Sequence, residues 1–144
     1  MRKLLCSGWS DKGALTGAIM AIYCGVDIIE IERLKNSIDN VIGFRERVFT
    51  EAESTYCENR KRARYESYAA RFAAKEAVMK ALGTGMAEGL GWKQIEIVND
   101  EKGKPHAVLT SRALELYREM GAKSMDVSVS HCGDLAIAYV VIDA

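Results

Sequence analysis

Two carboxylates stand out in this sequence because of the patterns that surround them. Asp27 follows an apolar run that predicts a β-strand, and Glu76 falls within a helical pattern over residues 65–82. Glu76 lies on the apolar row of that helix, one turn after Phe72 and one turn before Lys80. A carboxylate on a core-facing row is costly to bury unless it meets a metal, a cation or several donors. Two carboxylates and a phosphate-bearing ligand make a typical magnesium site, because Mg²⁺ keeps waters and needs few protein ligands.

A simpler interpretation of the same residues is open. Asp27 would only end a strand, and Glu76 would form an i,i+4 ion pair with Lys80. Periodicity alone slightly favours this interpretation because such pairs are common, whereas the place of Glu76 on the apolar row favours a site. Arg71, Lys75 and Lys80 are cations near the glutamate, so a bound polyphosphate could meet more than one of them. A solvated basic face is the alternative, and it suits Lys75 best.

The composition is that of an ordinary soluble globular protein. The chain has 144 residues, of which 49% are hydrophobic and 28% charged, and its formal net charge is zero. This balance disfavours nucleic acid and acidic membranes as partners. No apolar run reaches the ~20 residues of a membrane span, so we expect a cytoplasmic protein. A disulfide stays open, but free thiols are the simpler interpretation of the four cysteines, which share no metal-type spacing: Cys6, Cys24, Cys57 and Cys132.

The chain divides into an N-terminal appendage and one domain. Residues 1–19 are rich in glycine and serine and show weak periodicity, and a charged break at residues 11–13 argues against an export signal. The length of residues 20–144 suits a single domain with its own core. We therefore expect the function to lie within residues 20–144.

The periodicities predict an α+β fold, with helices first, antiparallel hairpins last and the long helix 65–82 between them. Asp27 would share the less apolar side of its strand with Tyr23 and Gly25, and Thr50 and Glu53 would form a capping box. The glycine-rich loop 83–91 is a candidate mobile lid that lacks the pattern of a Walker loop. The other predicted elements are strands at 21–29, 93–99, 106–110, 125–131 and 135–142, and helices at 30–38, 44–49, 50–60 and 111–120.

Four motifs, in order, resemble those of the holo-[acyl-carrier-protein] synthases, the short trimeric type of the 4′-phosphopantetheinyl transferase superfamily. Gly25–Arg33 is similar to the family's Gly-x-Asp-x5-Arg opening, and Arg71–Gly85 to its central signature. Gly103–Pro105 and Ser128–His131 resemble the two later motifs. The resemblance runs from Met20 to the C-terminus. It implies the phosphopantetheinyl transferase fold, an antiparallel β-sheet packed around a long central helix.

The resemblance also implies an activity. Enzymes of this family transfer 4′-phosphopantetheine from coenzyme A to a serine of apo acyl carrier protein with Mg²⁺, release 3′,5′-ADP and make holo carrier for fatty-acid synthesis. By position, Asp27 and Glu76 would be the magnesium ligands. Glu76, directly or through a water, would take the serine proton, and Lys80 would neutralise the diphosphate. The adenosine and its 3′-phosphate would lie near Arg71, Gly103, Lys104, Pro105 and His131.

Partners follow from the resemblance as well. Arg33, with Arg45 or Arg47 as weaker candidates, would meet the acidic carrier protein. The family forms homotrimers with active sites at subunit interfaces. Taken alone, the three arginines would be scattered surface charge, and His131 a surface or capping residue. Two other functions compete with the transferase: a non-catalytic oligomer that binds coenzyme A or a nucleotide, and a phosphotransfer or phosphohydrolase enzyme using the same magnesium site.

Overall fold

The structure, a computed structural model, describes residues 20–85 and 89–144. Helices precede the β-hairpins along the chain, which confirms the predicted α+β class. The elements are β1 (Ile22–Glu30), α1 (Ile31–Asn40), α2 (Phe44–Val48), α3 (Glu51–Asn59), η1 (Lys61–Ala63), α4 (Arg64–Leu82), η2 (Trp92–Gln94), β2 (Ile95–Asn99), β3 (Pro105–Leu109), α5 (Ser111–Glu119), β4 (Ser124–Cys132) and β5 (Leu135–Asp143).

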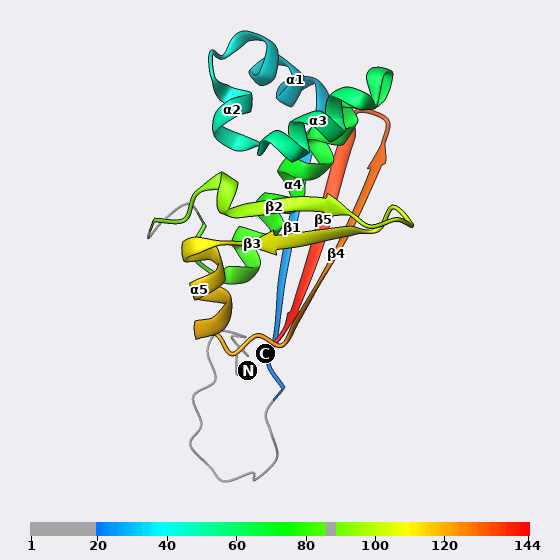
Figure 1. The fold of residues 1–144 in the computed structure, drawn as a ribbon. Coiled ribbons are helices and arrows are strands. Elements are labelled where there is room, and N and C mark those ends of the chain that lie inside the picture. Colours follow the sequence, from blue (N-terminus) through cyan, green and yellow to red (C-terminus); the bar gives the residue numbers. More distant parts are fainter. Residues whose placement is uncertain (1–19, 86–88) are drawn as a thin grey trace, which may run out of the picture.

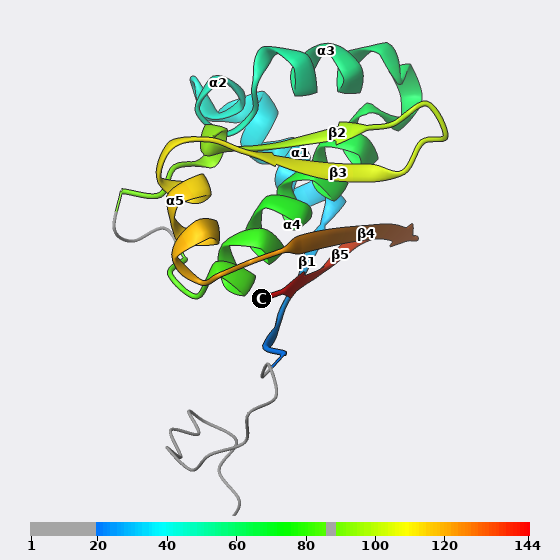
Figure 2. The ribbon, with the colours of Figure 1, turned by 60° about the horizontal axis from the view of Figure 1, so that its bottom comes forward.

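Helix α4 is the centre of the fold, as the sequence predicts. It lies between a three-stranded sheet and the β2–β3 hairpin (Figure 1 and Figure 2), while α1, α2 and α3 gather at one end. Gly83 ends the helix with a φ of 82°, a left-handed conformation that glycine adopts without strain. Small side chains let the neighbouring elements approach α4 closely, and five of its six alanines are buried: Ala69, Ala73, Ala74, Ala77 and Ala81.

The three-stranded sheet has the order β1-β5-β4 and is antiparallel throughout. Its inner face packs on α4, and the inward row of β5 consists of small and branched residues that are fully buried. Gly25 on β1 lies against the backbone of α4, where a Cβ atom would meet Ala77 and Ala81. A glycine at this position therefore permits the strand and the helix to touch.

The two faces of β1 differ from the usual arrangement of a half-buried strand. Ile22, Val26 and Ile28 are exposed, whereas Gly25 and Asp27 point toward α4. The less apolar side of the strand thus faces the core, and the apolar side belongs to an outer sheet face. Asp27 also does not end the strand, because β1 continues to Glu30. On β5 the same outer face carries Leu135, Ile137 and Tyr139.

The short helices form where the sequence predicts them. Thr50 accepts a hydrogen bond from the Glu53 backbone N–H at 3.2 Å, and the Glu53 carboxylate accepts one from the Thr50 backbone N–H at 2.8 Å. This confirms the capping box at the start of α3. The other element ends differ from the prediction mostly by one or two residues, although the predicted strand 93–99 starts with the 3₁₀ turn η2.

Several expectations concern residues that the structure does not describe. The appendage 1–19 and residues 86–88 of the predicted lid lie outside the described residues, and so does Cys6. The three described cysteines, Cys24, Cys57 and Cys132, are free thiols. Among the described helices, none combines the length and the apolar character that crossing a bilayer requires.

Candidate functional site

Asp27 and Glu76 line one pocket where β1 packs against α4. The pocket has a volume of about 250 Å³, and Arg33, Phe44 and Phe72 contribute to its wall. Strand β1 carries Asp27 on its helix-facing row, and α4 carries Glu76 toward the same place. The structure thus brings together two carboxylates that are 49 residues apart in the sequence.

Lys80 joins this group through Asp27. Its Nζ lies 2.8 Å from Asp27 Oδ1 and donates a second hydrogen bond to the Val26 carbonyl oxygen at 2.9 Å. Among the described residues, Lys80 therefore forms its ion pair with Asp27 and not with Glu76. The simpler interpretation, an i,i+4 ion pair between Glu76 and Lys80, is wrong. Burial, and then the nearby Asp27 carboxylate, raise the pKa of Glu76, while Lys80 acts in the opposite direction.

The donor set of this pocket fits Mg²⁺. Within residues 20–85 and 89–144, no cluster of three or more His, Cys, Asp or Glu side chains could hold a metal ion. Mg²⁺ needs fewer protein ligands, because waters and phosphate oxygens complete its six positions. The Asp27 carboxylate contributes to the raised pKa of Glu76, so the two negative charges repel each other. A cation bound between them would relieve this repulsion.

A second group of candidate residues gathers at the tip of the β2–β3 hairpin. Arg71, which is buried on α4, donates a hydrogen bond of 2.6 Å from Nη2 to Asn99 Oδ1. Asn99 in turn donates from Nδ2 to the Gly103 carbonyl oxygen at 2.9 Å. The Arg71 guanidinium also stacks on the Tyr56 ring at 3.9 Å, and its Nε has no hydrogen-bond partner among the residues that the structure describes. Arg71 and the Gly103 motif therefore lie close together, as the resemblance implies.

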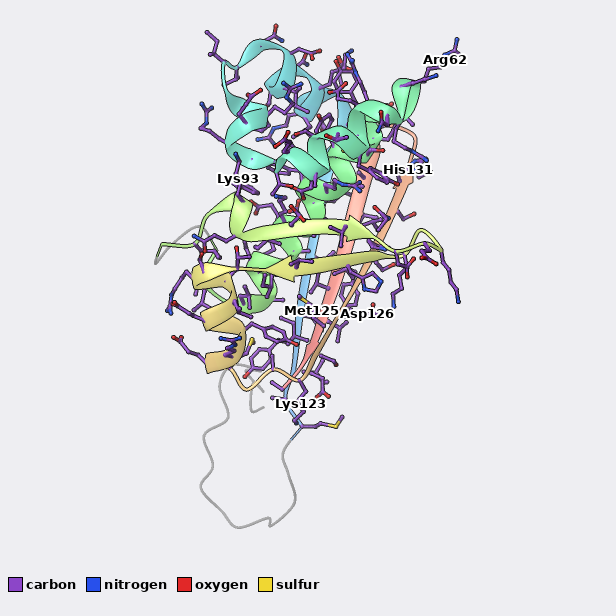
Figure 3. The ribbon with its side chains drawn as sticks, in the orientation of Figure 1. Arg62, Lys93, Lys123, Met125, Asp126 and His131 are labelled. Atoms are coloured by element: carbon purple, nitrogen blue, oxygen red, sulfur yellow. The ribbon has the colours of Figure 1, made fainter. Side chains whose placement is uncertain are left out.

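The hairpin turn holds its own shape. Asp100 Oδ1 accepts hydrogen bonds of 2.9 Å from the backbone N–H groups of Lys102 and Lys104, and Gly103 adopts a φ of 84°. The Lys104 Nζ reaches Asp126 on β4 at 2.8 Å. Figure 3 shows Asp126 on that strand beneath the hairpin. Hydrogen bonds within the turn and an ion pair to β4 thus hold this turn in place.

Sequence reasoning missed two residues of this second group, Asn99 and Tyr56. Asn99 is the last residue of β2, where a polar residue is ordinary, and nothing local marks it as a partner of Arg71. Tyr56 lies on α3, and only the packing of α3 against α4 brings its ring under the guanidinium. The single sequence signal for Asn99 is its place at the end of the predicted strand 93–99, where the chain has to turn toward the strand 106–110.

The structure does not unite the two groups in one pocket of the chain. Arg71 and Glu76 are five residues apart, which turns their side chains about 140° away from each other around α4. Arg71 and Lys80 are also separated by a rise of about 13 Å along the helix. His131 lies near the end of β4 and is exposed (Figure 3), on the strand row that contains Val127 and Val129. Within the described residues, no hydrogen bond or ion pair links His131 to the carboxylates or to the Arg71 group.

The expectation that Lys75 lies on a solvated basic face is wrong. Its side chain is fully buried and lies 2.8 Å from Glu53 Oε2, inside the contact between α3 and α4. Burial lowers the pKa of Lys75, and the Glu53 carboxylate opposes that shift. Helical periodicity placed Lys75 outside because it cannot reveal a partner that comes from another helix.

Comparisons with known proteins identify the family of this arrangement. A sequence profile of the 4′-phosphopantetheinyl transferase superfamily matches residues 23–140. The chain belongs to this superfamily. It is 49% identical over 124 residues to the holo-[acyl-carrier-protein] synthase of Ruminiclostridium cellulolyticum, an alignment that covers 85% of this chain and 92% of that protein. The expected family and the expectation of a transferase enzyme are thereby confirmed.

Solved structures of related synthases share the fold of this phosphopantetheinyl transferase. A crystal structure from Bacillus anthracis, described as a complex with CoA (3′,5′-ADP), is 34% identical with a TM-score of 0.72, covering 87% of this chain and 98% of that one. A Helicobacter pylori synthase in complex with coenzyme A is 31% identical with a TM-score of 0.72, covering 83% of this chain and 98% of that one. These matches confirm the predicted phosphopantetheinyl transferase fold.

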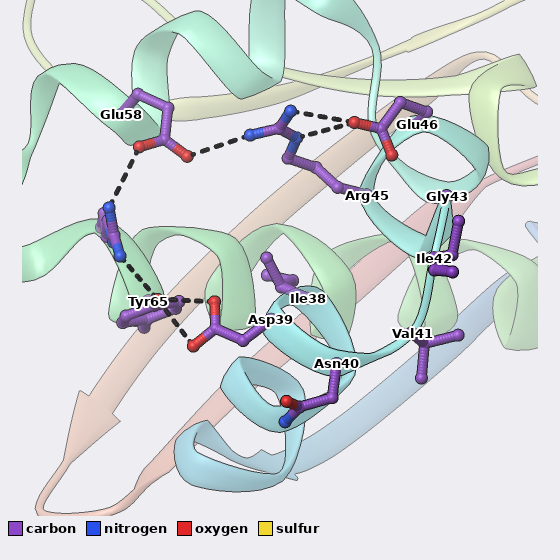
Figure 4. A pocket seen from close by; sticks show the side chains of 11 residues that line it. Ile38, Asp39, Asn40, Val41, Ile42, Gly43, Arg45, Glu46, Glu58 and Tyr65 are labelled. Atoms are coloured by element: carbon purple, nitrogen blue, oxygen red, sulfur yellow. Dashed lines mark hydrogen bonds and ion pairs between the residues drawn. The ribbon is translucent and has the colours of Figure 1, made fainter.

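The three arginines expected to dock a carrier differ in their surroundings in this transferase. Arg33 is exposed and lines the pocket of Asp27 and Glu76. Arg45 lies in a separate pocket of about 440 Å³, where it contacts the carboxylates of Glu46 at 2.9 Å and Glu58 at 3.6 Å (Figure 4). Arg47 donates a hydrogen bond to the Ile42 carbonyl oxygen at 3.0 Å. Of the three, Arg33 alone borders the carboxylate pocket.

Proposed function

We propose that residues 20–144 form one catalytic domain that transfers 4′-phosphopantetheine from coenzyme A to a serine of apo acyl carrier protein. The observation that carries the proposal is the joint pocket of Asp27 and Glu76, with Lys80 beside it, in a chain of this superfamily. The names of the related synthases and their complexes with coenzyme A support the donor and the acceptor. Magnesium, the docking residues and the trimer are our further proposals.

The residues of the carboxylate pocket divide the work of the reaction. The serine hydroxyl oxygen attacks the β-phosphorus of coenzyme A, the bond to the bridging oxygen breaks, and 3′,5′-ADP leaves. Glu76 would take the serine proton, directly or through a water, because its carboxylate lies in the same pocket as Asp27. Lys80, which now pairs with Asp27, would turn its ammonium toward the diphosphate.

Asp27 and Glu76 are the residues that would hold Mg²⁺. The chemistry that the ion supplies when bound is neutralisation of the diphosphate charge and a better leaving group. Lys80 would then be free to leave Asp27, because the cation replaces it as the partner of that carboxylate.

The nucleotide end of coenzyme A would bind at the second group. Arg71 offers a guanidinium that is already fixed by Asn99 and Tyr56, so little further ordering is needed to bind a phosphate. Gly103, Lys104 and Pro105 would flank the adenosine, and His131 would approach from β4. Because this group and the carboxylate pocket lie on different sides of α4, we propose that one active site takes them from two neighbouring chains.

The carrier would dock beside the carboxylate pocket. Arg33 would meet an acidic side chain of the carrier, since it borders the pocket and is exposed. Arg45 and Arg47 would contribute less, because their guanidinium groups already have partners within the chain. Ile42, 96% exposed at the turn before α2, would add an apolar contact. We propose a carrier of cytoplasmic fatty-acid synthesis as the substrate.

The outer face of the three-stranded sheet supports a homotrimer. Ile22, Val26 and Ile28 from β1 and Ile137 and Tyr139 from β5 form an exposed apolar surface, and such a surface on a sheet usually marks an interface. We therefore propose that chains associate through this face as a trimer, and that the trimer completes the site by placing the carboxylate pocket of one chain near the hairpin of another.

Placing a charge on this face should separate the chains. Ile137→Glu sets a carboxylate in the middle strand of the outer face, where desolvating it on assembly is costly. We expect the trimer to become a monomer at micromolar concentration in multi-angle light scattering, with loss of transfer. Val108→Glu is the matched control, since Val108 is similarly exposed but lies on β3. A monomeric wild-type chain would remove the shared site from the proposal.

Removing the guanidinium of the nucleotide group should weaken coenzyme A binding. For Arg71→Ala we expect the KM for coenzyme A to rise about 10- to 100-fold, the equivalent of one or two charged hydrogen bonds. The turnover at saturation should change much less, because Arg71 is remote from the carboxylates. Initial rates at varied coenzyme A measure this, with Arg118→Ala on the exposed side of α5 as control. An unchanged KM would mean that the nucleotide binds elsewhere.

One assay separates the candidate functions. Apo acyl carrier protein, coenzyme A and Mg²⁺ are incubated with the chain, and the carrier is weighed by mass spectrometry. We expect the carrier to gain one phosphopantetheine group and 3′,5′-ADP to appear, and both products to vanish when EDTA removes the metal. Coenzyme A binding without modification of the carrier would favour the non-catalytic oligomer. Release of phosphate or nucleotide without a carrier would favour a hydrolase.

A further inference from the structure

The one fully buried ion pair among the described residues is the pair of Glu53 and Lys75, and the proposed mechanism does not use it. Both side chains have no exposed surface, and Lys75 Nζ lies 2.8 Å from Glu53 Oε2. Lys75 comes directly before Glu76 in the sequence, yet it points away from the carboxylate pocket. The cost of desolvating two buried charges can cancel their attraction, so a buried ion pair need not stabilise the fold. The segments that this pair connects are therefore the better guide to its role.

Every polar atom of the pair has a partner. The Lys75 ammonium donates to Glu53, to the Val48 carbonyl oxygen at 2.9 Å and to the Trp92 carbonyl oxygen at 3.0 Å, which uses its three N–H groups. Glu53 Oε1 accepts from the Ile97 backbone N–H at 2.9 Å. The pair therefore ties together the end of α2, the start of α3, the middle of α4, η2 and β2.

The bond to Ile97 fixes the hairpin that carries the nucleotide group. Within residues 20–85 and 89–144, strand β2 pairs only with β3, so no strand takes up the backbone groups on its other edge. On that edge the Ile97 backbone N–H donates a hydrogen bond to Glu53. Two residues later, the side chain of Asn99 accepts a hydrogen bond from Arg71. The spacing of the two attachment points is similar on the helix and on the strand. Arg71 and Lys75 are about 6 Å apart along α4. Their partners' positions on the strand, Asn99 and Ile97, are about 7 Å apart along β2.

The bond to Trp92 reaches toward the carboxylate pocket. The Trp92 ring packs on Phe72 with ring centroids 4.8 Å apart, and Phe72 packs on Phe44 at 6.4 Å. Phe44 and Phe72 line the pocket of Asp27 and Glu76. Lys75 thus lies between the two groups of candidate residues and contacts the support of each.

We propose that Glu53 and Lys75 are positioning residues for the transfer, which hold the β2–β3 hairpin at the height on α4 where Arg71 and the Gly103 turn bind the nucleotide. This inference rests on the proposed function. Coenzyme A has to meet rigidly placed groups at both its nucleotide and its diphosphate, so a hairpin that slides or tilts loses nucleotide contacts first. The pair acts through Ile97 and Asn99 and touches no substrate.

The test uses the full chain and the variants Lys75→Met and Glu53→Gln. Lys75→Met keeps the volume but removes the charge, and Glu53→Gln keeps an acceptor for the Ile97 N–H. We expect the KM for coenzyme A to rise about 10-fold in Lys75→Met and less in Glu53→Gln, with kcat within threefold of wild type. The affinity for 3′,5′-ADP, measured by calorimetry, should fall by the same factor. Hydrogen exchange of the Ile97 amide should become faster.

A control separates positioning from a loss of stability. Leu116→Ala removes a buried side chain from α5 that makes none of the hydrogen bonds of the pair, and it should lower the Tm without changing the KM for coenzyme A. All assays run at a temperature where each variant is folded. If Lys75→Met does not fold, Glu53→Gln decides the question alone.

The outcomes are distinct. A folded variant with the wild-type KM and the wild-type affinity for 3′,5′-ADP would overturn the positioning role and leave the pair a structural feature only. Equal rises in the KM of coenzyme A and of the carrier would also contradict it, since the hairpin serves the nucleotide. A wild-type chain that transfers nothing, yet binds 3′,5′-ADP, would refute the proposed function and still allow the binding part of the test.

Discussion

Glu76→Gln should leave the chain folded and assembled while it lowers transfer to the carrier at least about 100-fold. Glutamine has the shape of glutamate, so the packing of α4 against β1 should survive. It has no negative charge to attract Mg²⁺ and cannot take the serine proton, so both proposed roles of Glu76 are lost together. The half-buried position of the carboxylate adds to the effect, because water replaces it poorly there.

Three measurements separate a loss of transfer from a loss of folding or assembly. Holo carrier is quantified by mass spectrometry, oligomeric state by light scattering and folding by thermal unfolding. In buffer without metal, the variant should bind 3′,5′-ADP as wild type does, because Arg71 and the hairpin lie on another side of α4. Glu115→Gln, an exposed carboxylate on α5, is the matched control. Holo carrier formed at a near-normal rate by Glu76→Gln would refute the role of Glu76.

Among the glycines that the structure describes, Gly25 is the one whose replacement by alanine should disturb folding most. The new Cβ would lie 2.8 Å from the Ala77 carbonyl carbon and 2.9 Å from the Ala81 nitrogen, and it would overlap the Ala77 oxygen. These are backbone atoms, so no side chain can rotate away, and α4 has to move off β1. We expect a loss of about 3 kcal/mol or more in the free energy of unfolding.

The same variant should also lose activity beyond its loss of stability. Asp27 is two residues from Gly25 and Glu76 is next to Ala77, so a helix that moves off the strand pulls the carboxylates apart. Urea unfolding and transfer rates at low temperature test both effects. Gly91→Ala is the control, because a Cβ there meets its nearest atom at an ordinary 3.6 Å and φ is −122°. A Gly25→Ala variant as stable as Gly91→Ala would contradict the close packing of β1 on α4.

Some features of this protein are determined by residues that lie near one another in the sequence. The central helix, its end at Gly83 and the capping box of Thr50 and Glu53 follow from periodicity, a left-handed glycine and a spacing of three. The pairing of Asp27 with Glu76 is different: it is predicted by the position of Glu76 on an apolar row and by the order of four motifs along the chain. All of these signals are present in the sequence itself.

Other features depend on contacts between distant segments. Periodicity indicated a solvated Lys75, but Glu53, 22 residues away, buries it as part of an ion pair. The apolar row of β1 faces outward and the row with Asp27 faces α4, because Gly25 is the residue that lets the helix approach. Alternation along a strand separates its two faces but cannot say which one meets the core.

The division of the candidate site is likewise a property of the tertiary structure. In the sequence, Arg71 and Glu76 belong to one motif. In the structure, Arg71 contacts Asn99 at the hairpin, whereas Glu76 lines a pocket with Asp27. A helix with 3.6 residues per turn sends side chains five positions apart to different sides. The sequence by itself therefore determined which residues are candidates for the chemistry, and only the packing of β1, α4 and the β2–β3 hairpin decided which of these candidates lie together in one chain.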